Sequence, residues 1–415
     1  MRKKVVIIGG GFGGLNSAKK LRNADVEITL IDKTNHHLFQ PLLYQVATAA
    51  LSPGDIAAPI RAILNKQHNV TVIMDEVTDV DPENKKVFMN DGNYFTYDYL
   101  IVAIGSKHSY FGKDEWAEYA PGLKTVSDAL HIREKILLSF EKAERKGGKE
   151  DTAGLTTFVI VGGGPTGVEL AGAIAEISNK ALLKDFRNIN PADAKIILVE
   201  AQDRILTSYD PSLSEKAKKS LEKLGVEILL NTKVSDINAK GVTLNGSFLQ
   251  TQNVIWAAGN QVPSLIKSLG AKTDRAGRAI VEPDCSVKNR PEIFVIGDAA
   301  MSTKNGKQLP GVAPVAIQQG KYVAKTIMRD LRHQKRKPFN YLDKGNLATI
   351  GRAKAIMETG GIKISGFPAW VAWVFIHILY LISYRNRYKV LSEWIWYYIT
   401  YKQGIRLITR DTNLN

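Results

Sequence analysis

The chain has 415 residues, of which 44% are hydrophobic and 23% charged, a globular composition that excludes a mainly disordered protein and allows two or three domains. Its formal net charge of +15 at pH 7 indicates an acidic partner, such as nucleic acid, an anionic membrane surface or an acidic ligand. The sequence carries no zinc-ligand spacing and no basic helix with heptads, so we expect neither a nucleic acid partner nor a bound metal.

The cysteine content restricts the possible redox chemistry. Cys285 is the only cysteine, which excludes a disulfide framework, a four-cysteine iron–sulfur cluster and any dithiol couple. Electron transfer by this chain would therefore need a bound organic cofactor.

The N-terminal segment predicts a dinucleotide-binding unit. A short apolar strand, Val5–Ile8, leads into Gly9–Gly14, a glycine turn with the pattern G-x-G-x-x-G. A helix-compatible stretch, Leu15–Leu21, and a second strand, Val26–Ile31, follow, and the strand ends in Asp32. Glycine lets the backbone approach a pyrophosphate, the helix N-terminus attracts its charge, and the terminal acid accepts from a ribose hydroxyl. The pattern alone could be an ordinary tight turn, but here strand, helix and acid are all present.

The same pattern recurs later in the chain. Strand Phe158–Val161 leads into Gly162–Gly167, a helix follows, and strand Lys195–Val199 ends in Glu200. Two complete patterns predict two bound nucleotides, one in each domain. The Glu200 carboxylate favours NADH over NADPH because it bonds a ribose 2′-hydroxyl and repels a 2′-phosphate, although Arg204 nearby would weaken that preference.

Three further apolar strands end at glycine and predict a doubled α/β fold. Two of them are Leu100–Gly105 and Val254–Gly259. The third, Ile293–Ile296, leads into Gly297 and Asp298, which we interpret as a close turn and a new helix start. Asp298 alone would be a helix N-cap, and a ligand contact is compatible with that role.

The C-terminal region predicts membrane association. Four of the six tryptophans fall there, Phe367–Tyr384 is almost wholly apolar, and Val390–Tyr401 repeats aromatic residues at helical spacing. Arg385, Arg387 and Lys389 stand between these segments, where cations beside aromatic rings attract anionic headgroups. We favour helices that lie in the membrane interface over one spanning helix, because the apolar stretch only reaches the lower length limit. A buried core helix with an oligomer contact is the soluble alternative.

As a set, these motifs resemble the two-dinucleotide flavoprotein reductases over about residues 1–335. The resemblance implies FAD on the first glycine turn, NAD(P)H on the second, and a contact from Gly297 and Asp298 to the ribityl–phosphate chain of the flavin. The dithiol branch of these reductases, like the sulfide:quinone reductases, needs a cysteine pair that this chain lacks.

Two segments carry a narrower resemblance, to the type II NADH:quinone oxidoreductases, single-subunit NADH dehydrogenases that do not pump protons. His36–Ala47 is similar to the segment that follows the FAD ribose acid in that family. Leu309–Gly320 resembles the family's quinone-site helix, whose usual pattern is A-Q-x-x-x-Q. Ala313 and Gln318 match it, whereas Pro314 replaces the first glutamine, a residue that suits a helix start.

The resemblance also implies the site residues. Glu169 would lie by the nicotinamide and flavin, in substrate contact or proton handling, or else be a carboxylate stabilised by a helix N-terminus. Gln318 would face the quinone or be a surface amide, and Lys354 would donate to a quinone carbonyl or be a solvated lysine. We expect His36 and His37 to pack or hydrogen-bond in a loop near the flavin rather than bind metal. The expected cofactor-binding residues are Gly9, Gly11, Phe12, Gly14, Asp32, Lys33, Gln45, Gly105, Gly162, Gly164, Gly167, Glu200, Gly259, Gly297, Asp298 and Ala316.

We therefore predict an α/β protein with two Rossmann-like dinucleotide-binding domains and a C-terminal membrane-anchoring helical segment. The expected boundaries are 1–118 and 276–335 for the FAD-binding domain, the latter with the quinone-site helix, 119–275 for the NADH-binding domain, and 336–415 for membrane association. The predicted function is FAD-dependent transfer of two electrons from NADH to a membrane quinone without proton pumping. The alternatives are a soluble NAD(P)H-dependent reductase of a ferredoxin or rubredoxin, and an NADH-binding redox sensor with little turnover.

The predicted location is the cytoplasmic face of a bacterial inner membrane, because no targeting segment precedes the first strand. We expect a peripheral, monotopic protein that contacts lipid through its C-terminal region and forms a homodimer.

Overall fold

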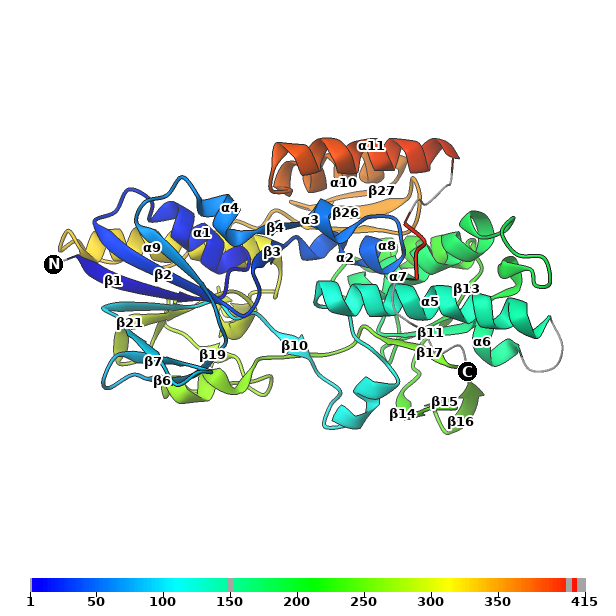
Figure 1. The fold of residues 1–415 in the computed structure, drawn as a ribbon, viewed down its shortest axis with the longest axis horizontal. Coiled ribbons are helices and arrows are strands. Elements are labelled where there is room, and N and C mark those ends of the chain that lie inside the picture. The colour runs from blue at the N-terminus through cyan, green and yellow to red at the C-terminus, as the bar shows by residue number, and fades with distance from the viewer. Residues whose placement is uncertain (1, 148–151, 401–404, 409–415) are drawn as a thin grey trace. The chain divides into compact units, whose positions relative to one another are not determined.

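The computed structural model describes residues 2–147, 152–400 and 405–408. The chain forms two compact units, each built from three stretches of sequence (Figure 1). The first unit comprises residues 1–38, 57–107 and 260–343, and the second comprises 39–56, 108–259 and 344–415. The chain therefore passes between the units five times, and the domain boundaries expected from the sequence stay predictions.

The first unit is built on a six-stranded sheet in the order β20-β21-β9-β1-β2-β5. All neighbouring pairs are parallel except β20 and β21. The central strands have fully buried apolar residues, as expected for a parallel sheet covered on both faces. The strands predicted from the first glycine pattern are confirmed. The bounds are β1 Lys3–Ile8, β2 Val26–Asp32, β5 Val70–Met74, β9 Tyr99–Val102, β20 Ser286–Val287 and β21 Arg290–Val295.

Two helices of the first unit, α1 (Phe12–Lys20) and α9 (Ala313–Asp330), pack against each other. Their backbones approach closely at Gly320, where an added Cβ would lie 2.3 Å from the Gly13 carbonyl oxygen. The Ser17 hydroxyl donates to the Gly320 carbonyl at 3.1 Å across the same contact. The predicted quinone-site helix is thus confirmed as a helix, and it is fixed against the helix of the first glycine turn.

The second unit repeats the arrangement with a four-stranded parallel sheet in the order β13-β12-β11-β17. In both units the strand before the glycine turn lies between the strand that ends in the acid and a strand from later in the chain. Two Rossmann-like units are therefore confirmed. The bounds are β11 Thr157–Val161, β12 Lys195–Val199, β13 Val226–Leu229, β17 Asn253–Trp256, α7 Pro165–Glu176 and α8 Pro211–Glu222.

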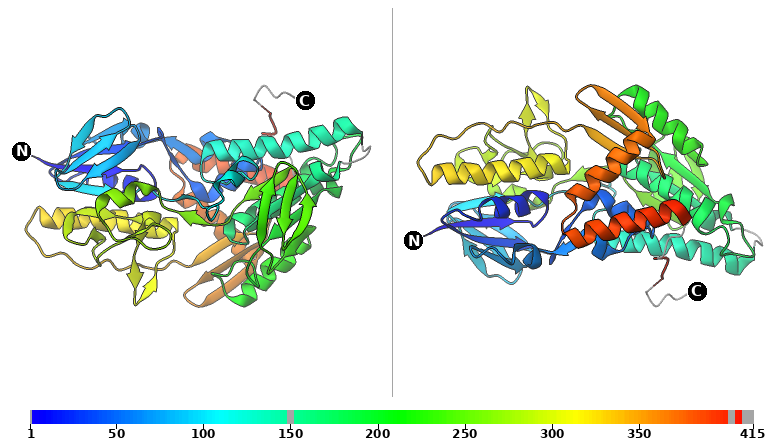
Figure 2. Two further views of the ribbon diagram at one scale, coloured as in Figure 1. Left: turned by 90° about the horizontal axis from the view of Figure 1, so that it is seen from below. Right: turned by 90° about the horizontal axis from the view of Figure 1, so that it is seen from above.

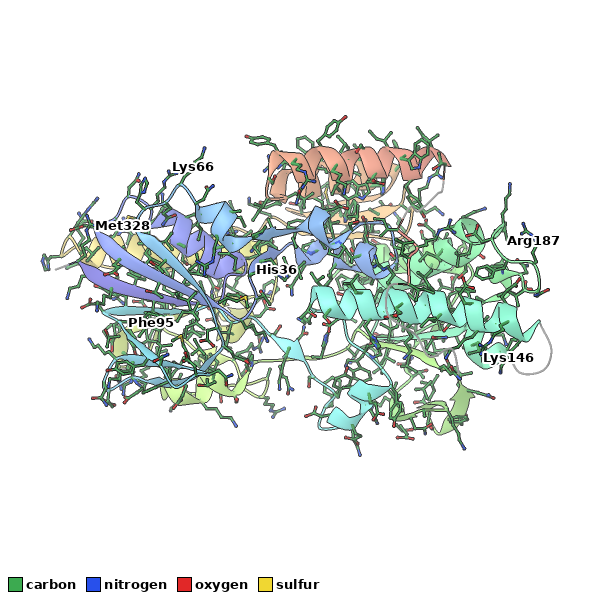
Figure 3. All side chains as sticks on the ribbon, in the orientation of Figure 1. His36, Lys66, Phe95, Lys146, Arg187 and Met328 are labelled. Carbon is green, nitrogen blue, oxygen red and sulfur yellow. The ribbon has the colours of Figure 1, made fainter. Side chains whose placement is uncertain are left out.

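The longest helix of the described residues, α5 (Val126–Lys146), was not predicted from the sequence. Thr125 and Asp128 form a reciprocal capping box at its start. Two basic residues, one of them Lys146 (Figure 3), stand in its last turn, and Gly147 follows with a φ of 65°. These are standard start and stop signals, and they identify the helix once its register is known.

The smaller elements connect or flank the two sheets. The first unit holds β3 His36–Leu38, β4 Ala57–Pro59, α4 Ile60–Leu64, β6 Val77–Asp81, β7 Lys86–Met89, β8 Tyr94–Thr96, η5 Ser264–Leu269, β19 Ala279–Ile280, η6 Gly297–Ala299, β22 Ala300–Met301, β23 Thr303–Lys304 and β24 Lys307–Gln308. The second unit holds η1 Gln40–Leu42, α2 Leu43–Ala47, α3 Pro53–Ile56, η2 Asp114–Glu118, α6 Ala153–Thr156, η3 Ile177–Ala181, η4 Pro191–Asp193, β14 Val234–Asn238, β15 Gly241–Leu244, β16 Ser247–Gln250, β25 Asn346–Thr349, β26 Ala355–Thr359 and β27 Ile362–Gly366. Strands β10 (Lys107–His108) and β18 (Asn260–Gln261) stand where the chain passes between the units.

The C-terminal region of the second unit forms two helices that lie side by side, α10 (Phe367–Tyr380) and α11 (Tyr384–Thr400) (Figure 2). The apolar stretch from 367 to 384 is not one continuous helix, because α10 ends at Tyr380 and Ser383 takes a φ of 80°. Arg387 stabilises this break, since its guanidinium donates to the carbonyl oxygens of Leu379 at 2.7 Å and Leu381 at 2.9 Å. Tyr401, the last residue of the second predicted segment, lies outside the described residues.

The outer faces of α10 and α11 carry many exposed apolar side chains. Within the described part of the chain, neither these helices nor any other combine the length and the apolarity that crossing a bilayer requires. The exposed set on the two helices includes Phe367, Val371, Phe375, Leu379, Tyr384, Tyr388, Ile395, Trp396 and Ile399.

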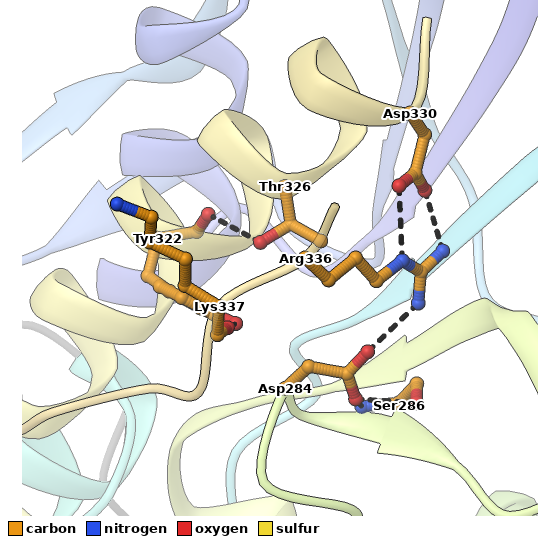
Figure 4. A network of polar contacts seen from close by, with 7 residues as sticks. All are labelled: Asp284, Ser286, Tyr322, Thr326, Asp330, Arg336 and Lys337. Carbon is orange, nitrogen blue, oxygen red and sulfur yellow. Dashed lines mark hydrogen bonds and ion pairs between the residues drawn. The ribbon is translucent and has the colours of Figure 1, made fainter. Parts of the chain in front are cut away.

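A partly buried ion network holds the segment that follows α9 (Figure 4). Arg336 donates to both Asp330 carboxylate oxygens, at 3.0 and 2.5 Å, and to Asp284 at 2.9 Å. Asp284 also accepts from the backbone N–H and the hydroxyl of Ser286. The Arg336 guanidinium further lies over the Phe294 ring, 5.1 Å from its centroid. Because both carboxylates depend on one guanidinium, the network ties the end of α9 to the β20 region.

We expect Arg336→Ala to destabilise the protein by about 2–4 kcal/mol, because two partly buried carboxylates would lose their counter-charge. Thermal unfolding of the purified protein measures the change. The exposed Arg332 is the matched control, and its alanine variant should unfold within about 0.5 kcal/mol of the parent. Equal unfolding temperatures for the two variants would contradict a stabilising role for the network.

Candidate nucleotide and electron-transfer site

The first glycine turn and Asp32 form one hydrogen-bonded unit. The Gly10 backbone N–H donates to Asp32 Oδ2 at 2.6 Å, and Asp32 Oδ1 accepts from the Thr34 N–H and hydroxyl, both at 2.7 Å. The carboxylate is therefore held by the backbone at the end of β2, in position to receive a ribose hydroxyl.

Close backbone contacts exclude a side chain at Gly9 and Gly14 of this turn, whereas Gly11 faces open space. Gly9 has a φ of 99°, and an added Cβ there would lie 2.4 Å from the Ala103 carbonyl oxygen. A Cβ on Gly14 would lie 1.9 Å from the Gly9 carbonyl oxygen. A Cβ on Gly11 meets no atom within 4 Å, and no side chain caps α1. An open backbone at an uncapped helix N-terminus fits a pyrophosphate.

The second glycine turn has the same design. The Gly163 N–H donates to Glu200 Oε2 at 2.6 Å, and Glu200 Oε1 accepts from the Gln202 N–H at 2.8 Å. A Cβ on Gly167 would lie 1.8 Å from the Gly162 carbonyl oxygen, whereas one on Gly164 meets nothing within 4 Å. No side chain caps α7 either. The described geometry of the two units thus fits two nucleotides.

The Arg204 guanidinium is hydrogen-bonded to the backbone of its own loop. Its guanidinium donates to the carbonyl oxygens of Tyr209 and Thr207, both at 3.0 Å. The side chain expected to weaken a preference for NADH is thus hydrogen-bonded within its own loop.

The turn at Gly297 and Asp298 is positioned by α9. The Gly297 N–H donates to Gln319 Oε1 at 2.7 Å, and Gln319 Nε2 donates to the Ser302 hydroxyl at 2.8 Å. Asp298 Oδ2 accepts from the Ser106 hydroxyl at 2.8 Å. The helix expected after Asp298 is wrong: a single 3-10 turn ends at Ala299, because Ala300–Met301 continues as a strand paired with β19. Gln319 was not identified as a site residue from the sequence, because its full burial could not be inferred from the motif.

Other predicted residues of the first unit lie around the same two turns. His37 is buried, and its Nδ1 lies 3.0 Å from the Gly10 carbonyl oxygen, in accord with the expected hydrogen-bonding role. The Phe12 ring packs edge-on against His37, with 5.1 Å between centroids. Ala316 faces Gly297, since a Cβ on Gly297 would lie 3.2 Å from the Ala316 Cβ. Lys33 is exposed.

The strand-end glycines Gly105 and Gly259 both take positive φ, 68° and 71°. An added Cβ at Gly105 would meet nothing, whereas one at Gly259 would lie 2.7 Å from the Ser109 carbonyl oxygen. Gly105 therefore leaves room for a ligand, and Gly259 is explained by packing within its own unit.

Glu169 stands in the second turn of α7, in a partly buried position. Burial raises the pKa of Glu169 to about 8, although a hydrogen bond from the Thr349 backbone lowers it in part. A carboxyl group with this pKa is mostly protonated at pH 7 and can give up a proton near neutral pH.

The side chains of three predicted site residues interact with other residues of the protein. Gln45 is buried, accepting from the Trp394 indole at 2.7 Å and donating to the Tyr44 hydroxyl at 2.8 Å. The Gln318 amide exchanges two hydrogen bonds of 2.9 Å with the Leu342 backbone. Lys354 is half-buried and lies within electrostatic reach of the buried Glu176.

Cys285 is unsuited to thiol chemistry. It is buried and has a φ of 65°, and burial raises the pKa of its thiol far above the usual value. The one cysteine of the chain is therefore a packing residue.

Comparison with known proteins identifies the family. Residues 3–320 match the family model described as pyridine nucleotide-disulphide oxidoreductase. The chain is 44% identical to the type II NADH:quinone oxidoreductases Ndh and NdhA of Mycobacterium tuberculosis, with 98% and 95% of this chain and 90% and 86% of those proteins covered. The chain belongs to the type II NADH:quinone oxidoreductases. Its fold is also that of NDH2 from Plasmodium falciparum, solved in complex with NADH, with a TM-score of 0.88 at 22% identity over 99% of this chain and 100% of that one.

The open Gly164 and the tightly packed Gly167 of the second glycine turn predict that substitutions at the two positions affect binding and folding separately. We expect Gly164→Ala to leave the unfolding temperature nearly unchanged but to weaken NADH binding at least about tenfold, because the methyl group would occupy the space left for a phosphate. Gly167→Ala should instead destabilise the fold by about 2 kcal/mol or more, because its Cβ meets backbone. Thermal unfolding and an NADH titration of both variants check the pair. A Gly164→Ala protein that binds NADH normally would contradict the placement of the phosphate.

Proposed function

We propose that this protein oxidises NADH through bound FAD and passes two electrons to a membrane quinone without pumping protons. The observation that carries the proposal is the 44% identity over nearly the whole chain to a protein named type II NADH:quinone oxidoreductase. Two complete nucleotide turns, each with its own strand-end carboxylate, supply the two cofactor sites that this reaction needs. FAD, when bound, supplies the hydride acceptor and electron donor chemistry that the side chains lack.

We assign the residues of the first unit to FAD. The Gly9–Gly14 turn and Asp32 would hold the adenosine and pyrophosphate part, and Gly297 with Asp298 the ribityl–phosphate part. Gln319 would set the position of Gly297, since it accepts the N–H of that residue. We also assign Phe12, Lys33, Gly105 and Ala316 of this unit, and Gln45 of the second unit, to contacts with FAD.

We assign Gly162, Gly164, Gly167 and Glu200 to NADH, with Gly259 at the neighbouring strand end. Glu200 would accept from the ribose 2′-hydroxyl and repel the 2′-phosphate of NADPH. Arg204 donates to the Tyr209 and Thr207 carbonyl oxygens of its own loop, so a contact from its guanidinium to a 2′-phosphate would compete with these bonds.

We assign Glu169 to substrate contact or proton handling by the nicotinamide and flavin, and Gln318 and Lys354 each to a contact with the quinone. Glu169 would hold and give up a proton, and Lys354 would donate to a quinone carbonyl. Gln318 would contact the quinone only if its amide exchanged the Leu342 backbone for the ligand. Pro314 occupies the second position of α9, so the chain offers one glutamine rather than two at this motif.

The C-terminal helices support a peripheral membrane location. The exposed apolar residues of α10 and α11 would enter the interface, and the tyrosines and tryptophans suit the headgroup level. Of the three cations expected to contact headgroups, Arg387 is bound to carbonyls and Lys389 pairs with Asp55 at 2.7 Å, which leaves Arg385 for that contact. Within this proposal the protein is a homodimer on the cytoplasmic face of a bacterial inner membrane.

The test is oxidation of NADH and NADPH by the FAD-loaded protein with a short-chain quinone as the sole acceptor. We expect rapid quinone-dependent oxidation of NADH and oxidation of NADPH at least about tenfold slower in kcat/KM, because of the Glu200 charge. Flavin that NADH reduces quickly but quinone does not reoxidise would instead favour a protein acceptor, such as a ferredoxin or rubredoxin.

The pH dependence of quinone reduction tests the role of Glu169. Its protonated form is present below about pH 8 and is lost as the pH rises through that value, so the rate of quinone reduction should fall above pH 8. In Glu169→Gln the alkaline limb should disappear and the rate should fall about 100-fold. Stopped-flow reoxidation of reduced flavin from pH 6 to 10 measures both. Normal NADH reduction and normal quinone turnover in Glu169→Gln would rule out this role.

A further inference from the structure

The indole N–H of Trp373, on α10, has no hydrogen-bond acceptor among the described residues. The residue is only 2% exposed, and its Nε1 atom is shielded from solvent. The ring of Trp394 packs beside it, with 4.9 Å between centroids, and the Trp394 N–H donates to Gln45 Oε1 at 2.7 Å. One of two adjacent buried indoles therefore has an acceptor within the protein and the other does not. Because a buried donor without an acceptor costs free energy, a ligand oxygen would complete this arrangement.

His377 lies one turn further along α10 and stacks on Trp373, with 4.3 Å between ring centroids and 28° between ring planes. Its Nδ1 lies 2.8 Å from the Trp373 carbonyl oxygen. That oxygen can only accept, so Nδ1 carries the proton and the lone pair of a neutral ring is on Nε2. Burial lowers the pKa of His377 to about 4, so the ring is neutral at pH 7. Nε2 has no hydrogen-bond partner in the part of the chain that the structure describes.

Aromatic rings surround this donor and this acceptor. Phe39, which directly follows β3, meets the His377 ring edge-on with 6.1 Å between centroids, and Trp394 packs against Trp373. The outer face of α10 carries exposed apolar side chains, so an apolar ligand can reach this helix from a lipid phase. A flat, neutral ring with a carbonyl or hydroxyl oxygen matches these neighbours, because it can pack against aromatic rings and also meet the two polar atoms.

We propose that Trp373 and His377 bind the ring of the quinone through one of its oxygen atoms. In the quinone this oxygen is a carbonyl, which accepts from the Trp373 N–H. In the quinol it is a hydroxyl, which accepts from Trp373 and donates to His377 Nε2. The site thus holds both redox forms of the ligand and makes one more hydrogen bond to the quinol. This proposal rests on the proposed function, and it adds two residues to the quinone contacts assigned to Gln318 and Lys354.

Substitution of each ring tests the site in the FAD-loaded enzyme. His377→Phe keeps a flat ring at this position but removes the lone pair, and Trp373→Phe removes the N–H. In both variants we expect the KM for a short-chain quinone to rise at least about fivefold. Reduction of the flavin by NADH and its reoxidation by ferricyanide should stay within about twofold of the parent, because neither step uses the quinone site. Trp370→Phe is the matched control, since Trp370 stacks on Tyr398 from the same helix, and it should keep the parent KM.

The indole N–H also reports binding directly in the oxidised enzyme, without turnover. The chain has six tryptophans, so a protein labelled with nitrogen-15 tryptophan gives a simple spectrum of indole N–H signals. The signal that is missing in Trp373→Phe identifies Trp373. A short-chain quinone should shift this signal downfield in the parent, as expected for an N–H that gains an acceptor, whereas phosphatidylglycerol vesicles without quinone should leave it in place. A signal that quinone does not move, or that the vesicles move as far, would overturn the proposal.

The kinetic results can contradict the site in two ways. An unchanged KM for quinone in both His377→Phe and Trp373→Phe would overturn the proposal. An equal loss of NADH reduction, ferricyanide reoxidation and quinone reoxidation would also overturn it, because that pattern means a structural role. If the parent enzyme reduces ferricyanide but not quinone, the proposed function fails, and the response of the Trp373 signal to quinone still decides whether the ring binds at this site.

Discussion

The hydrogen bond from a glycine N–H to a strand-end carboxylate organises both halves of this molecule. Gly10 donates to Asp32 in the first unit, and Gly163 donates to Glu200 in the second, each at 2.6 Å. Each bond joins the turn after one strand to the end of the next, and the helix that follows is left with an uncapped N-terminus. Because backbone N–H groups hold the carboxylate in place, its remaining acceptor positions suit the hydroxyl groups of a ribose. The rest of each site is arranged around that bond.

Helix α7 connects the nucleotide turn of the second unit with its buried acids. Its first residues follow the open glycine Gly164, and its body carries Glu169 and Glu176 on one face. The inner face of α11 supplies partners to this region at successive turns: Lys389 to Asp55, Trp394 to Gln45 and Tyr397 to Glu176. The outer face of α11 carries the exposed aromatic and aliphatic residues. Helix α11 therefore carries an exposed apolar face on one side and, on the other, side chains that pair with Asp55, Gln45 and Glu176.

Much of the fold could be predicted because the apolar strands and glycine turns are local patterns. Strands β1, β11 and β12 fall where continuous apolar runs end in glycine or an acid, and β2 falls where the alternating run Val26–Ile31 ends in Asp32. The break after Tyr380 could not be predicted, because it depends on Arg387 reaching back to carbonyls of the previous helix. The partners of Arg387 and Lys389 could not be predicted either, because a count of charges does not show which cations pair within the protein.

The sequence by itself determined the fold class, the two nucleotide turns and the family, because each depends on residue types at fixed short spacings. Only the tertiary structure decided which side chains are buried and what they bond. Gln319 and Gln318 are neighbours in sequence, yet one holds Gly297 from a buried position and the other pairs with the exposed Leu342 backbone. Glu176 looks like any helical glutamate until Tyr397, from the far end of the chain, is placed against it. Desolvation and hydrogen-bond partners come from residues distant in sequence, and a linear pattern carries no information about them.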